Sequence, residues 1–113
     1  MHELNYAMRH CIANCTESHN ICTETIIHCL EVGGAHAESS HVRLLIDCAE
    51  ICSISAEFML RGSPTHTRIC GICADICEQC AKECERFTDD ARMQHCANIC
   101  HSCSLSCREM ALN

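Results

Sequence analysis

Cysteine is the residue type whose number and spacing in this chain point most directly to chemistry. Fifteen of the 113 residues are cysteines. A thiol that loses its proton is a nucleophile and a strong ligand for soft metal ions. The candidate metal ligands are therefore Cys11, Cys15, Cys22, Cys29, Cys48, Cys52, Cys70, Cys73, Cys77, Cys80, Cys84, Cys96, Cys100, Cys103 and Cys107.

The spacing of these cysteines predicts that they line the inside of a helical bundle. Most are three or four residues from the next along each run, as on the inward stripe of a bundled helix. When heptads are assigned with the phase free in each helix, all fifteen fall at core positions a and d. The interior should therefore be lined with sulfur.

The turn signals of the sequence divide it into four helices. The first is expected over 3–32 and ends at Gly33-Gly34, and the second is capped by Ser39 or Ser40 and ends at Arg61-Gly62. The third opens at Ser63-Pro64 and runs to about Phe87, and Thr88-Asp89-Asp90 caps the fourth. Short connections favour an all-α, antiparallel up-down-up-down four-helix bundle, which forms one domain over 1–113.

Composition and charge exclude several classes of protein. A formal net charge of −7 argues against nucleic-acid binding, which needs clustered Lys and Arg. No apolar run is long enough to span a membrane, and the first residues do not resemble an export signal. We therefore expect a cytoplasmic protein. Because no acid, base or nucleophile is set in a recognisable cleft pattern, we expect no enzymatic activity.

Other uses of so many cysteines fit the pattern less well. A disulfide scaffold is opposed by the odd number of cysteines and by the expected reducing compartment. Structural zinc requires closed sets of four ligands, whereas this ladder is continuous and suits soft Cu(I), which accepts two or three sulfurs and bridging thiolates. Residues 70–84 read C-x2-C-x3-C-x2-C-x3-C, which departs from the ferredoxin spacing. An iron–sulfur or thiol-redox protein and a zinc-thiolate buffer remain the alternatives.

The two densest cysteine segments resemble those of the bacterial cytosolic copper storage proteins. These segments are CGICADICEQCAKEC over 70–84 and CANICHSCSLSC over 96–107. The resemblance implies a bundle whose core stores many Cu(I) ions, a homotetrameric assembly and no catalysis; the sequence does not identify the copper donor. Ser18, Thr25 and Ser55 occupy stripe positions where further thiols would fit, so we expect lower capacity in the half built from the first two helices.

Antiparallel topology allows the two ends of the bundle to be compared. One, the histidine-rich end, gathers His36, His41, Phe87, Met93 and His95 near Asp89 and Asp90. The other, the methionine-rich end, gathers Leu4, Met8, Met59, His66 and Met110. Imidazole and thioether both bind Cu(I), so either end could admit metal. Of the two, we favour the histidine-rich end as the entrance, with His41, Met93 and His95 as additional ligands. The methionine-rich end is interpreted as a hydrophobic plug.

The remaining surface features concern solvation and assembly. Five histidines lie off the cysteine stripe and are expected to be solvated: His2, His10, His19, His28 and His101. The second helix also carries apolar residues beyond its inward stripe: Val42, Leu44, Ile46, Ile51, Ile54 and Leu60. This broad apolar surface favours self-association.

Overall fold

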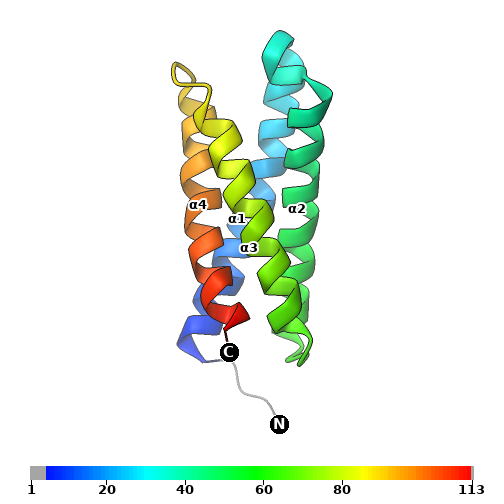
Figure 1. Cartoon of the computed structure of the whole chain (residues 1–113), viewed down its shortest axis with the longest axis vertical. Helices are drawn as coiled ribbons and strands as arrows, with labels where there is room; N and C mark the ends of the chain where they lie inside the picture. The colour runs from blue at the N-terminus through cyan, green and yellow to red at the C-terminus, as the bar shows by residue number, and fades with distance from the viewer. Residues whose placement is uncertain (1–4, 113) are drawn as a thin grey trace.

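The computed structural model describes residues 5–112, which form four α-helices and one short 3-10 helix. Their bounds are Tyr6–Val32 (α1), Gly34–Ala37 (η1), Ser39–Leu60 (α2), His66–Glu85 (α3) and Ala91–Ala111 (α4). Successive helices run in opposite directions along a rod of 50 × 19 × 18 Å (Figure 1). The predicted all-α, up-down-up-down bundle is confirmed.

The four helices form a closed ring around the bundle axis. Helix α1 packs mainly against α2, and α3 packs mainly against α4; contacts between α1 and α4 and between α2 and α3 close the ring. Among the described residues, the backbones of the diagonal pairs α1/α3 and α2/α4 do not approach closely, and these helices meet only through side chains on the axis. The inward side chains of all four helices therefore fill the axis, and these are the side chains that the cysteine stripe supplies.

Glycines end the first two helices as predicted. Gly33 has φ 77°, and its amide donates to the Cys29 carbonyl, so the chain leaves α1 through a conformation that other residues rarely adopt. Gly62 has φ 65° and follows α2 in the same way. Helix η1, which the sequence analysis did not predict, occupies the connection after Gly33 and carries His36 over the end of the bundle.

The helix starts were predicted less accurately than the helix ends. Asp90 caps α4 within the predicted segment, and its carboxylate accepts from the amides of Arg92 and Met93. The prediction that Ser39 or Ser40 caps α2 was wrong, because Ser39 is already the first helical residue and Glu38, which precedes it, makes no side-chain cap. Asn5 caps α1 by accepting from the Met8 amide at 2.8 Å, a signal that the sequence analysis missed.

The prediction that α3 begins at Pro64 was wrong. Pro64 and Thr65 form a turn in which the His66 amide donates to the Ser63 carbonyl at 3.1 Å, and regular helix begins only at His66. At the other end, the Phe87 amide donates to the Cys84 carbonyl three residues earlier, so α3 tightens and ends at Glu85 rather than Phe87. The predicted contribution of Leu4 lies outside the described residues.

Within 5–112, no helix is long and apolar enough to cross a membrane.

Candidate metal centre

The fifteen cysteines form a column of buried thiols along the axis of the bundle. Each is between 0% and 1% exposed, and all fifteen are free thiols. Helix α1 contributes four, α2 two, α3 five and α4 four, all from the inward stripes. The prediction of a sulfur-lined core is confirmed. Few large side chains share this interior; Leu45, Met59 and Met93 are the largest apolar ones that are fully buried.

Neighbouring sulfurs in the column lie in contact across helices. Near one end, Cys107 Sγ lies 3.6 Å from Cys11 Sγ and 3.4 Å from Cys15 Sγ. In the middle, Cys52 Sγ lies 3.4 Å from Cys77 Sγ and 3.7 Å from Cys73 Sγ. Because the two sulfurs of each pair come from different helices, an ion bound between them would link two or more helices of the bundle.

Three groups of four cysteines could each enclose a metal ion. In each group the sulfurs all lie within 4.8 Å of one another. The groups are Cys15, Cys73, Cys103 and Cys107; Cys52, Cys73, Cys77 and Cys103; and Cys22, Cys48, Cys80 and Cys100. The first two share Cys73 and Cys103, so they are not independent closed sites. Shared ligands are suited to bridging thiolates between several ions.

Hydroxyl groups interrupt the column at the three predicted positions. Ser18, Thr25 and Ser55 are all buried. Ser18 Oγ accepts from the Cys52 thiol at 3.3 Å and lies 3.7 Å from Cys100 Sγ, while Ser55 donates to Cys70 Sγ at 3.4 Å. These side chains occupy thiol positions in the packing but offer harder oxygen donors, which hold Cu(I) less well.

Burial controls the protonation of the column. The pKa of Cys29 is raised to about 11, first because burial disfavours the thiolate and then because Cys96 and Asp90 lie nearby. Within the clusters, thiols act on one another. Side-chain hydrogen bonds with Cys100 and Cys22 lower the pKa of Cys48, whereas those with the same two residues raise the pKa of Cys80. A cluster therefore favours one thiolate and opposes the next ionisation.

At the histidine-rich end the column finishes in a mixed set of donors. Cys29 Sγ lies 3.4 Å from His41 Nε2 and 3.7 Å from Met93 Sδ. His41 and Met93 are both buried, and the His41 ring packs against Phe87 with centroids 5.0 Å apart. The structure therefore brings His41 and Met93 together next to Cys29, the last cysteine of α1. These are two of the three additional ligands that the sequence analysis proposed.

His41 is held in the form that can bind a metal. Burial lowers the pKa of its imidazole, and this effect outweighs the nearby Glu83 carboxylate, which acts to raise it. Its Nδ1 lies 3.5 Å from Glu83 Oε1, which is too long for a good hydrogen bond. At neutral pH the ring is therefore uncharged, with a nitrogen lone pair available.

His95 does not join this set, contrary to the sequence-based expectation. It is exposed on α4, and it lines surface pockets with Ile21 and Glu24 of α1. The physical reason is its position one residue before Cys96, about 100° around the helix from the inward stripe. Its proposed role as a ligand of the column has no geometric support.

The off-stripe histidines divide into two kinds. His10 and His101 are exposed as expected, and His2 lies outside the described residues. The solvated assignment was wrong for His19, which is half-buried with Nδ1 2.7 Å from the Ala49 carbonyl oxygen. It was also wrong for His28, whose Nε2 lies 2.7 Å from Asp90 Oδ2. The sequence signal that could have predicted the His28 contact was Asp90, the expected cap of α4.

The methionine-rich end is closed by buried side chains. Met8, Met59, His66 and Met110 are all buried where α1 and α3 begin and where α2 and α4 end. His66 Nδ1 donates to the Ser63 carbonyl at 2.8 Å, while its Nε2 is buried and has no hydrogen-bond partner among residues 5–112. This end therefore holds an unused imidazole lone pair as well as the predicted apolar plug.

Fold and site together define a class: four-helix bundles whose cores are columns of metal-binding thiols. The model of one family, described as copper storage protein, matches residues 4–112 of the chain. The chain belongs to the copper storage protein family.

Individual relatives cover nearly the whole chain. The uncharacterized cysteine-rich protein YhjQ of Bacillus subtilis is 39% identical over 101 residues, which is 89% of this chain and 93% of that protein. The crystal structure of the Nmul_A1745 protein of Nitrosospira multiformis is 43% identical with a TM-score of 0.89, covering 94% of this chain and 95% of that one. The Cu(I)-bound copper storage protein BsCsp3 is 37% identical with a TM-score of 0.86, covering 93% and 98%.

Proposed function

We propose that this protein stores many Cu(I) ions on the thiolates of its core and performs no catalysis. The observation that carries the proposal is the column of fifteen buried free thiols, many of whose sulfurs lie 3.4 to 4.0 Å from another sulfur of the column. Family membership supports it, as does the similarity to BsCsp3, which is described as Cu(I)-bound. The whole chain then acts as a single storage domain.

The arrangement of ligands favours Cu(I) over zinc. Structural zinc takes four ligands in a closed tetrahedron, so each zinc ion needs its own set. Two of the four-cysteine groups share Cys73 and Cys103 and cannot both be filled in that way. Cu(I), with two or three sulfurs per ion and bridging thiolates, can use every cysteine, giving about one ion per thiol as an order-of-magnitude capacity.

Filling the column should release protons, and this release tests thiolate binding directly. With its pKa raised to about 11, the Cys29 thiol is protonated at neutral pH, and the Cu(I)-bound form is the thiolate. We expect up to about one proton released per Cu(I) bound at pH 7, and fewer where a cluster already holds a thiolate. The apparent affinity should weaken as the pH falls, because protons compete for the sulfurs. A weakly buffered anaerobic titration with a pH indicator measures this. Cu(I) uptake without proton release would contradict thiolate ligation.

We further propose that Cu(I) enters at the histidine-rich end. Cys29, His41 and Met93 supply thiol, imidazole and thioether in contact with one another at the end of the column. An ion can pass from such a mixed site to the thiols by exchanging one ligand at a time. The opposite end is occupied by buried Met8, Met59 and Met110.

Replacing His41 and Met93 together by leucine should slow Cu(I) uptake about tenfold or more, because the first ligands of the route are removed. Final capacity should change little, since the fifteen thiols remain. Stopped-flow uptake from a Cu(I)-chelator complex measures the rate. The exposed His95, replaced by leucine, is the matched control and should load at the wild-type rate.

A second variant distinguishes the two ends. Replacing Met8, Met59 and Met110 by leucine keeps the apolar plug but removes its sulfurs. If this variant loads slowly while the His41/Met93 variant loads normally, the direction of filling is the reverse of the one proposed.

We also propose a cytoplasmic location and a homotetrameric assembly, from the resemblance to the cytosolic copper storage proteins. Apolar side chains on the outer surface support self-association: Ile46, Ile54 and Leu60 of α2 and Ile27 and Leu30 of α1 are 39% to 58% exposed.

A further inference from the structure

Three polar side chains from three different elements meet at the histidine-rich end, beside the thiol column. Asp90 Oδ2 lies 2.7 Å from His28 Nε2 and 2.9 Å from His36 Nε2. His28 is on α1, His36 is on η1 and Asp90 caps α4. The three possible ligand atoms all lie within 4.8 Å of one another, and the group contains no sulfur.

We propose that His28, His36 and Asp90 bind one divalent first-row transition-metal ion. Two imidazoles and one carboxylate form a ligand set that suits borderline divalent ions and leaves positions open for water. Soft Cu(I) prefers the thiols a short distance away. The proposal therefore concerns a different ion and different ligands from Cu(I) storage, and it does not depend on that function.

The carboxylate is already held in a binding geometry. Asp90 Oδ1 accepts from the amides of Arg92 at 3.0 Å and Met93 at 3.2 Å, which leaves Oδ2 for the two histidines. Burial alone would raise the pKa of Asp90, but the hydrogen bonds from His28, from His36 and from the Met93 amide outweigh it and lower the pKa. The group is therefore an anion at neutral pH.

The two imidazoles are also held in place. The His36 ring packs on Phe87 with centroids 4.2 Å apart, and the His28 ring meets His36 edge-on at 5.8 Å. The side chains of His28, His36 and Asp90 are 16%, 17% and 20% exposed, so the cluster is partly shielded yet reachable. Restricted side chains lose little further freedom on binding an ion.

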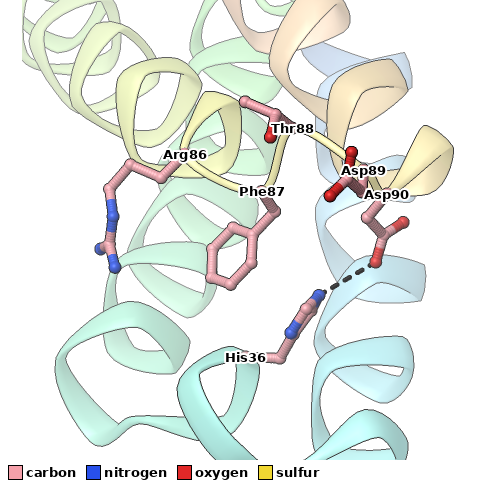
Figure 2. Close-up of a pocket in the computed structure, with 6 residues that line it drawn as sticks. All are labelled: His36, Arg86, Phe87, Thr88, Asp89 and Asp90. Carbon is pink, nitrogen blue, oxygen red and sulfur yellow. Dashed lines mark hydrogen bonds and ion pairs between the residues drawn. The ribbon is translucent and has the colours of Figure 1, made fainter.

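A surface cavity gives an ion access to two of these ligands, His36 and Asp90. The cavity of about 440 Å³ is lined by His36, Arg86, Phe87, Thr88, Asp89 and Asp90. Figure 2 shows His36 and Asp90 facing each other on one side of Phe87, with Arg86 on the other side. The carboxylates of Asp89 and Asp90 make this part of the cavity attractive to a hydrated cation.

An ion would take over the contacts that now hold the cluster together. Each imidazole donates from Nε2 to Asp90 Oδ2; with a metal bound, Nε2 would ligate through its lone pair and the ring proton would reside on Nδ1. The ion would then link α1, η1 and α4 across the end of the bundle. This linkage needs no movement of the thiols.

The test uses Co(II), which does not readily oxidise thiols and whose absorption spectrum reveals its ligands. We expect equilibrium dialysis of the Cu(I)-loaded protein to find one Co(II) per chain, with weak visible bands and without the intense near-ultraviolet bands of thiolate ligation. The reduced metal-free protein should show the same weak-band site. Because that second measurement does not require Cu(I) binding, a failure of storage and a failure of this proposal can be told apart.

Matched variants locate the site. Asp90→Asn keeps a good helix cap but removes the carboxylate, and His36→Gln removes one imidazole. Each should weaken Co(II) binding about tenfold or more, whereas His101→Gln, at an exposed histidine, should have no effect. Unchanged Co(II) binding in the first two variants, an equal loss in His101→Gln, or Co(II) bound only with intense thiolate bands would overturn the proposal.

Discussion

Replacing Cys73 and Cys103 together by serine should lower the capacity of the protein by about three or four Cu(I) ions, more than the two thiols removed. Both cysteines belong to two of the four-cysteine groups. Cys103 Sγ lies 3.7 Å from Cys15 Sγ and 4.0 Å from Cys52 Sγ, so it is placed to bridge ions in both groups. Serine is close in size, and Ser18 already packs in this column. Anaerobic Cu(I) titration with metal analysis measures the loss.

The matched control removes two thiols from the end of the column. Replacing Cys29 and Cys84 by serine should lower capacity by about two ions, because neither belongs to a shared four-cysteine group. In the opposite direction, Ser18→Cys should add about one ion, since its side chain already touches Cys48, Cys52 and Cys100. Equal losses from the central and terminal pairs would contradict bridging and indicate independent sites.

Loading with Cu(I) should raise the unfolding temperature by about 20 °C or more, and removal of the metal should reverse the change without unfolding the protein. A ligand present at a thousand times its dissociation constant contributes about 4 kcal/mol per site, against a typical folding stability of about 5–15 kcal/mol. The unfolded chain also binds copper through its thiols, so the gain is less than the sum over sites.

The same experiment tests whether the fold depends on metal. Four amphipathic helices, with Leu45 and Met59 buried among the thiols and Ile51 and Ile76 packed at the flanks, should remain helical when reduced and metal-free. Circular dichroism during heating measures both states. A random-coil spectrum for the metal-free protein would indicate folding on metal binding, and equal unfolding temperatures for the two states would contradict metal storage within the core.

The sequence was sufficient to predict the bundle and the thiol column. Cysteines three and four residues apart can share one face only on a helix, and Gly33 and Gly62 end their helices in conformations that glycine adopts readily. Position on the stripe also identified Ser18 and Ser55 as interruptions, because burial follows from the same periodicity.

The sequence was less informative where loops bring helix ends together. The sequence analysis grouped His95 with His41 and Met93 because the three lie at the same level along the bundle axis. It did not consider the angular position of His95 on α4, which directs the side chain away from the core. His28 lies off the stripe too, yet η1 and the cap of α4 bring His36 and Asp90 to it. Such contacts depend on how a loop folds, and helical periodicity carries no information about that.

The most direct test of the storage account is an anaerobic titration of the fully reduced, metal-free protein with Cu(I) against a competing chelator. Fifteen thiols in one column predict saturation at about ten or more Cu(I) per chain. Saturation at about one to four ions, or a preference for zinc in separate four-thiolate sites, would contradict the account.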